Sequence, residues 1–142
     1  MKKKNISYLY QYYEKIERNN KKIWSKNFFL NLLSRDEVFF FHTEKKMYGY
    51  LIARIISGDA EIISLAVDPK ERGKGYAKEL MDKLIKFAIN KKLKSIILEV
   101  CVVNLPAINL YLDSGFKKKA IRKKYYKINT NYYDAIILKL KL

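Results

Sequence analysis

The residues best placed to do chemistry form a short loop, Arg72-Gly73-Lys74-Gly75-Tyr76-Ala77, which lies between an apolar run and a helical pattern that begins near Tyr76. Two glycines let the main chain turn sharply and approach a ligand with no side chain in the way. The following helix points its unpaired N–H groups and the positive end of its dipole back into the loop. Arg72, Lys74 and Lys78 add positive charge. This arrangement predicts a site for a phosphate or pyrophosphate group.

The glycine spacing excludes two common phosphate-binding motifs. The dinucleotide fingerprint G-x-G-x-x-G requires a third glycine that this loop lacks, and the nucleotide motif G-x-x-x-x-G-K-S/T does not match either. What remains is R-x-x-G-x-A. A glycine turn that merely caps an ordinary helix would give the same short pattern, so support has to come from elsewhere in the chain.

A second block of residues follows about thirty positions later and provides that support. Residues 96–100 form a β-branched apolar run that predicts a buried strand, interrupted by Glu99. A helix over residues 105–114 is expected next, because Pro106 suits its first turn and Gly115 suits the left-handed residue that ends it. The whole block is L-E-V-x-x-x-N-x-x-A-I-x-L-Y-x-x-x-G-F.

The two blocks, in this order and at this separation, resemble the acyl-coenzyme A loop (Q/R-x-x-G-x-G/A) and the second block of the GCN5-related N-acetyltransferase (GNAT) superfamily. Trp24-Ser25 with Phe28, residues 60–69, Ile121-Arg122 with Tyr125-Tyr126, and residues 134–137 resemble its ribosomal-protein alanine N-acetyltransferases. The resemblance implies an acetyl-CoA-dependent acyltransferase that acetylates a protein N-terminus, the N-terminal alanine of a ribosomal protein, by direct attack on the thioester. A lysine side chain or a small amine is the alternative acceptor. The non-enzymatic alternatives are a basic module that binds RNA or a ribosomal partner and an acyl-CoA sensor without turnover.

The resemblance also implies which residues bind acetyl-CoA. In this superfamily two parallel strands splay apart, and the main chain of the first strand holds the pantetheine arm and the acetyl group. The side chain of Asn104 would hydrogen-bond the pantetheine, although asparagine also caps helices well and the two roles are compatible. The predicted cofactor-binding residues are Leu65, Ala66, Val67, Arg72, Gly73, Lys74, Gly75, Tyr76, Ala77, Lys78 and Asn104.

Two residues are candidates for proton transfer. Glu99 is unusual in an apolar strand because an unpaired buried charge is unfavourable, so we predict a general base that acts directly or through water. A partly exposed glutamate paired with a lysine is the alternative. Tyr111 is the candidate acid for the leaving thiolate, with a core aromatic as the alternative. Tyr125, Tyr126 and Asp134 are candidates to line the acceptor cleft, Asp134 by attracting the ammonium, and ordinary strand packing explains them equally well.

Two further residues argue for quieter roles. Cys101 stands where the ribosomal-protein enzymes carry arginine, which weakens the assignment of the substrate. His42 is the only histidine in the chain, so it makes neither a metal site nor a catalytic triad, and we expect no metal. The lone cysteine cannot form an internal disulfide and fits a reducing compartment.

The composition predicts one globular domain over residues 1–142, acting as a monomer or weak homodimer. No stretch approaches the roughly 20 apolar residues that span a bilayer, and no signal-peptide core follows Met1, so we expect a cytoplasmic protein without membrane contact. The net charge of +16 favours an anionic cofactor. Nucleic-acid contact is not expected as a main function, because the basic residues are scattered in small groups: 2–4, 21–22, 45–46, 91–94, 117–119 and 123–124.

The order of apolar patterns predicts an α/β (α+β) fold, a mixed central β-sheet flanked by about four helices, with the splayed pair of parallel strands holding acetyl-CoA. Helices are expected over residues 6–17, 25–33, from 76 onward, and over 105–114. Strands are expected over residues 38–41, 47–57, 60–67, 95–100, 117–127 and 134–141. The family's opening strand is short or missing, because almost no chain precedes the first helix.

Overall fold

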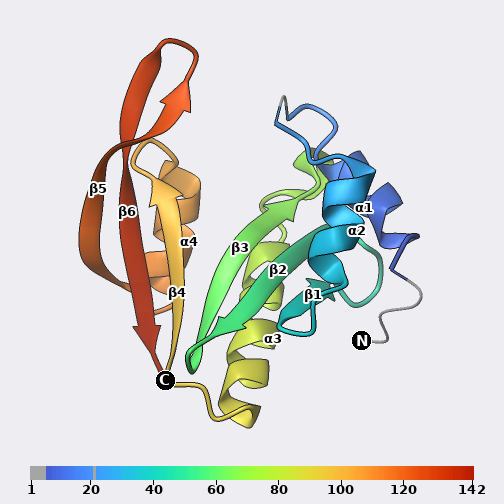
Figure 1. Cartoon of the computed structure of the whole chain (residues 1–142), viewed down its shortest axis with the longest axis horizontal. Helices are drawn as coiled ribbons and strands as arrows, with labels where there is room; N and C mark the ends of the chain where they lie inside the picture. Colours follow the sequence, from blue (N-terminus) through green and yellow to red (C-terminus); the bar gives the residue numbers. More distant parts are fainter. Residues whose placement is uncertain (1–5, 21) are drawn as a thin grey trace.

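The computed structural model describes residues 6–20 and 22–142 (Figure 1). In chain order the elements are α1 (Leu9–Ile16), α2 (Lys26–Leu33), β1 (Val38–His42), β2 (Gly49–Ile56), β3 (Asp59–Val67), a 3-10 turn (Pro69–Glu71), α3 (Tyr76–Asn90), β4 (Ser95–Cys101), α4 (Leu105–Asp113), β5 (Lys117–Ile128) and β6 (Asn131–Lys141). The expected elements are therefore confirmed to within a few residues at each end. The expectation of a short or missing opening strand concerns residues 1–5, which lie outside the described part of the chain.

The strands form one mixed sheet in the order β1-β2-β3-β4-β6-β5. Only β3 and β4 run parallel, joined by the crossover helix α3, and every other neighbouring pair is antiparallel. This arrangement confirms the predicted mixed α/β fold. It also leaves β5, the last strand but one in the sequence, at one edge of the sheet.

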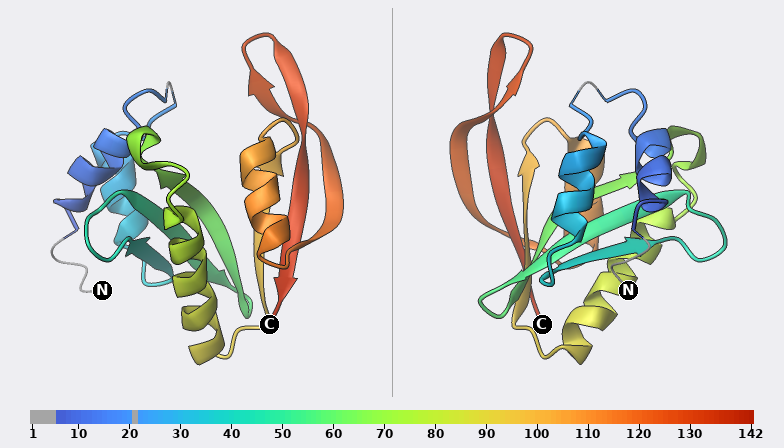
Figure 2. Two further views of the ribbon diagram at one scale, coloured as in Figure 1. Left: turned by 180° about the vertical axis from the view of Figure 1, so that it is seen from behind. Right: turned by 45° about the vertical axis from the view of Figure 1, so that its right-hand side comes forward.

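The helices cover both faces of the sheet. α3 and α4 lie on one face, and α1 and α2 lie on the other face over β1–β3 (Figures 1 and 2). The apolar side of α3 packs through Leu80, Leu84 and Ala88, which are fully buried and recur every four residues, as a helix buried on one side requires. A second core of aromatic and aliphatic side chains lies beneath α1 and α2, where Tyr13, Phe29 and Tyr50 meet.

The parallel pair is short, and the two strands diverge from it. β3 and β4 pair only over Asp59–Glu61 and Ser95–Ile97. Just beyond, the register between β2 and β3 shifts: Ala53 lies opposite Ile62, and Ile52 lies opposite Ser64. This bulge at Ile63 bends β3 away from β4. The predicted splay is confirmed, and from residue 62 to residue 67 the edge of β3 that faces β4 has no strand partner among the described residues (Figure 1).

The end of α4 follows from local backbone chemistry. Gly115 has the left-handed φ of 97° that was expected of a helix-ending glycine. The N–H of Phe116 donates to the carbonyl of Tyr111, and that of Gly115 donates to the carbonyl of Leu112, each at 3.0 Å. These are the two hydrogen bonds of a Schellman ending. They fix the last turn of α4, and with it the backbone of Tyr111.

Candidate active site

The glycine loop has the open geometry that its sequence predicts. Gly73 and Gly75 have φ values of 78° and 86°, a region that residues with a Cβ adopt with strain. A Cβ built on either glycine would meet no atom of the described residues within 4 Å. Gly75 is also the N-cap of α3, and no side chain in the described part of the chain caps the first N–H groups of that helix. The main chain of the loop can therefore accept an anion, as the pyrophosphate of acetyl-CoA requires.

The basic side chains around the loop are already paired. The Nε of Arg72 donates to the carbonyl of Val67 at 3.3 Å, which ties the loop to the end of β3. Lys74 pairs with Glu71 at 2.7 Å, and that hydrogen bond raises the pKa of the lysine. Lys78 pairs with a carboxylate one helical turn further on, at 2.9 Å. An anion bound at this loop would therefore meet the main-chain N–H groups directly, with the charges of the paired lysines around it.

Strand alternation places Glu99 on the face of the sheet away from α3 and α4. Its neighbours Leu98 and Val100 are buried in the core beneath those helices, whereas the Glu99 side chain is 29% exposed. Its Oε1 lies 3.4 Å from the Nε of Arg122 on β5. The alternative of a partly exposed, paired glutamate therefore describes the local structure, with an arginine in place of a lysine. The role of Glu99 as a base stays a prediction.

A cavity of about 430 Å³ lies around this pair, at the point where β3 and β4 separate. A second ion pair lines it, between Arg54 and Glu61, with the guanidinium 3.0 Å from the carboxylate. Sequence reasoning did not identify this pair. The two residues are seven positions apart on adjacent strands, and only the β2–β3 register shows that they lie opposite each other.

Two tyrosines bear on the proposed chemistry: Tyr126 contacts the candidate base, and Tyr111 lies in the core beneath α3 and α4. The hydroxyl of Tyr126 donates to the carbonyl of Glu99 at 3.5 Å, and burial, then the charge of Glu99, raises the pKa of Tyr126. Tyr111 is 7% exposed and packs against Phe116, so the core reading describes its packing. Burial, with a smaller contribution from Tyr126, raises the pKa of Tyr111 to about 12. The phenol therefore keeps its proton at neutral pH, as a general acid must.

The remaining predicted site residues have observed structural partners. Asn104 caps α4, its Oδ1 accepting from the N–H of Ala107 at 3.3 Å, so the capping role is confirmed. Asp134 accepts from the N–H of Lys124 at 2.9 Å, and this bond, more than the nearby Lys123, lowers the pKa of Asp134. The carboxylate thus holds an irregularity in β5 between residues 122 and 126. Tyr125 is half exposed and lies against the guanidinium of Arg122, 5.0 Å from the ring centre.

A larger cavity, of about 750 Å³, lies at the end of the molecule where the β5–β6 turn faces the segment between α1 and α2 (Figure 1). Glu17, Lys22, Arg72 and Lys127 line it, among others, and the Nζ of Lys22 donates to the carbonyl of Lys127 at 3.2 Å across it. Sequence reasoning missed this cavity because its walls come from three distant segments. Residues such as glycine, proline and asparagine predict where a turn lies, but they do not predict which turns contact one another in the fold.

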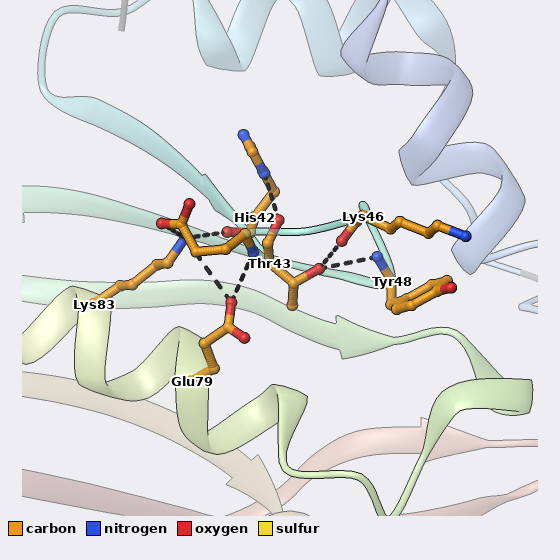
Figure 3. A network of polar contacts seen from close by, with 7 residues as sticks. His42, Thr43, Lys46, Tyr48, Glu79 and Lys83 are labelled. Carbon is orange, nitrogen blue, oxygen red and sulfur yellow. Dashed lines mark hydrogen bonds and ion pairs between the residues drawn. The ribbon is translucent and has the colours of Figure 1, made fainter.

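A polar network anchors the first turns of α3 to the β1–β2 connection (Figure 3). The Nζ of Lys83 donates to the carbonyl of His42 at 2.7 Å and pairs with Glu44 at 2.8 Å. Glu79 accepts from the N–H of Glu44 at 2.8 Å, and the hydroxyl of Thr43 donates to the carbonyl of Lys46 within the turn. The network fixes the direction in which α3 points its N-terminus. The main-chain carbonyl of His42 is thus part of this structural network.

Residues 6–20 and 22–142 contain no group of three or more histidine, cysteine, aspartate or glutamate side chains that could hold a metal ion. Within the same residues, no helix has the length and apolarity to cross a membrane.

Comparison with known proteins agrees with the geometry. The acetyltransferase (GNAT) family model matches residues 6–116. The ribosomal protein bS18-alanine N-acetyltransferase of Escherichia coli is 32% identical over 97 residues, which span 68% of this chain and 66% of that protein, just under two thirds of its length.

Solved structures share the fold. The crystal structure of the ribosomal-protein alanine N-acetyltransferase from Escherichia coli is 28% identical, with a TM-score of 0.81 over 91% of this chain and 84% of that one. Arabidopsis thaliana NAA60 in complex with acetyl-CoA is 20% identical, with a TM-score of 0.78 over 91% of this chain and 90% of that one. A glycine loop at the start of α3, a splayed parallel pair and a family match over most of the sequence lead to one conclusion: this chain belongs to the acetyltransferase (GNAT) family.

Proposed function

We propose that this protein transfers the acetyl group of acetyl-CoA to the N-terminal α-amine of a protein, and that its acceptor is the N-terminal alanine of a ribosomal protein. The observation that carries the proposal is the position of Glu99 beside the open gap between β3 and β4, on the face opposite α3 and α4. An acceptor amine reaches the thioester through the gap from that side. The similarity to the Escherichia coli bS18-alanine enzyme supports the choice of acceptor.

Acetyl-CoA, when bound, supplies an acetyl thioester. The free edge of β3, at Leu65, Ala66 and Val67, is available to hydrogen-bond the pantetheine arm and the thioester oxygen. A main-chain donor that faces the thioester oxygen stabilises the negative charge that develops on it, and so lowers the activation free energy by a few kcal/mol. Gly73 and Gly75 leave room for the pyrophosphate, and the side-chain amide of Asn104 has an Nδ2 group beyond its capping contact to reach the pantetheine.

The proposal assigns the two proton transfers to Glu99 and Tyr111. Glu99 removes the proton that the attacking amine loses, directly or through a water molecule, and Tyr111 gives its proton to the leaving sulfur. An α-amine has a pKa of about 8, so its deprotonation at neutral pH requires only about 1 kcal/mol. A lysine amine, with a pKa of about 10.4, requires roughly 4–5 kcal/mol. A single glutamate that acts directly or through water suits the easier amine.

We further propose that the acceptor peptide lies in the 750 Å³ cavity between the α1–α2 segment and the β5–β6 turn. Tyr125, Tyr126 and Asp134 stand on the β5–β6 side and would guide the amine toward Glu99. The protein acts in the cytoplasm as a single domain over residues 1–142, a monomer or weak homodimer. Cys101 is a free thiol, which agrees with a reducing compartment.

Two peptides test the acceptor. The first has a free N-terminal alanine and no lysine, and the second has the same residues with a blocked N-terminus and one internal lysine. Release of coenzyme A thiol with the first peptide only, and mass-spectrometric location of the acetyl group on its α-amine, is the expected result. Acetylation of the second peptide alone would transfer the assignment to lysine acceptors. Comparison of ribosomal-protein N-termini from cells with and without the gene then tests the natural substrate.

A further inference from the structure

The edge strand β5 carries a dense run of positive charge. Seven of its twelve residues are lysine or arginine, and none is acidic. Eleven of the twelve are exposed, and only Tyr126 is partly covered. In the sequence these charges appear as two small groups among many. Folding places both groups, together with Arg122 and Lys127, on one extended strand roughly 40 Å long at about 3.3 Å per residue.

Little of this charge is compensated within the described residues. Arg122 pairs with Glu99 and Lys123 pairs with Asp134, at 3.4 and 3.5 Å, and these are the ion pairs of the strand. The three consecutive lysines 117–119 form no ion pair with the described part of the chain. Lys117 lies opposite Lys139 on β6. Like charges in that position destabilise a strand pair, and a bound polyanion would relieve them.

Exposed aromatic rings lie among the cations. Tyr125 on β5 is 50% exposed, and Tyr132 on β6 is 56% exposed. The Arg122 guanidinium lies 5.0 Å from the first ring centre, and the Lys127 ammonium lies 5.7 Å from the second. Cations that contact phosphates and rings that stack on bases are the two components of single-strand binding. In a duplex the base faces are stacked inside the helix, and an acidic protein has no bases. Only a single strand therefore presents base faces that can stack on the two tyrosine rings.

We propose that β5 and the adjoining edge of β6 bind single-stranded nucleic acid. Phosphates lie along lysines 117–119, and bases stack on Tyr125 and Tyr132. This binding goes beyond acetyl transfer and does not depend on it. The strand ends at the 750 Å³ cavity, which Lys127 and Ile128 line, so a nucleic acid held there keeps a protein bound to it near the acceptor site.

Fluorescence anisotropy tests the proposal with labelled oligouridylate and oligothymidylate of about 20 nucleotides, long enough for one site. Between about 50 and about 200 mM salt, log Kobs falls with log salt by about 0.7 for each neutralised phosphate of a single strand. The triple variant K117Q/K118Q/K119Q is expected to reduce that slope by about 2. Tyr125→Ala and Tyr132→Ala are expected to weaken binding about 5- to 150-fold each at an unchanged slope. The two probes distinguish RNA from DNA as the ligand, and binding of either supports the proposal.

A matched control removes the same charge elsewhere. The variant K26Q/K45Q/K91Q changes three exposed lysines on α2, in the β1–β2 turn and after α3, and is expected to keep the parent's slope. An equal loss of slope in this control would overturn the proposal, as would polyglutamate binding as tight as oligouridylate binding. Tighter binding of a duplex than of a single strand would also refute it. Unchanged circular dichroism and unchanged acetylation of a short peptide by K117Q/K118Q/K119Q establish that the variant is folded.

Discussion

Replacement of Gly75 by alanine separates the strain in the loop from its contact with the cosubstrate, because the chain offers a matched glycine. Gly75 and Gly58 both have a φ of 86°, but Gly58 lies in the β2–β3 turn. A left-handed conformation destabilises a residue with a Cβ by roughly 1–2 kcal/mol, so both alanine variants are expected to lose about that much free energy of unfolding. Urea denaturation measures this common loss.

Only Gly75→Ala is expected to weaken coenzyme A binding. The added Cβ points into space that no described atom occupies within 4 Å, where we place the pyrophosphate. Loss of one hydrogen bond to a charged oxygen amounts to about 1.5–3 kcal/mol, which raises Kd about 10- to 150-fold. Isothermal titration with coenzyme A measures it, and Gly58→Ala should bind like the parent. If the two variants bind coenzyme A equally well, the loop does not hold the pyrophosphate.

Three other substitutions test the site and the core. Tyr111→Phe should lower kcat about 10²- to 10⁴-fold with little change in coenzyme A affinity, and a variant as fast as the parent would exclude the role as acid. Because the pKa of Tyr111 is raised to about 12, the parent's kcat should not fall through deprotonation of this tyrosine until the pH approaches that value. Glu99→Gln should lower kcat by a similar factor at neutral pH, and the deficit should shrink as rising pH deprotonates the amine in solution; a pH-independent deficit would contradict a role as base. Tyr50→Phe should reduce the free energy of unfolding by about 1.5–3 kcal/mol in urea denaturation, because the buried hydroxyl bonds Glu17 at 2.7 Å and Ser64 at 2.8 Å, and parental stability would mean that these bonds contribute nothing net.

The sequence predicts most of the fold because its local signals agree with one another. Glycines at left-handed positions, a proline in the first turn of α4 and the four-residue apolar period of α3 each describe short-range geometry that the structure keeps. Glu99 and Tyr111 are candidates because each belongs to a long pattern with a fixed order of residue types, and their roles stay predictions. The free edge of β3 was predicted through family resemblance and not from its own residues.

What the sequence could not give depends on pairing between distant segments. The ion pair between Arg54 and Glu61 requires the register of β2 against β3. The partner of Glu99 comes from β5, 23 positions later in the chain (122 minus 99). The grouping of lysines on β5 is not evident along the sequence, where the charges stand in small separate groups, whereas an exposed edge strand presents them together.

The three-residue pairing of β3 with β4 is the one hydrogen-bonded seam between the two halves of the sheet in the described chain. A molecule bound in the gap between β3 and β4 beyond this pairing would contact both halves of the sheet and hold them together. Any ligand that binds only the folded state at a hundred times its Kd adds about 2.7 kcal/mol to the free energy of unfolding. The stability of this protein in a cell, and with it its lifetime, should therefore increase with the concentration of acetyl-CoA.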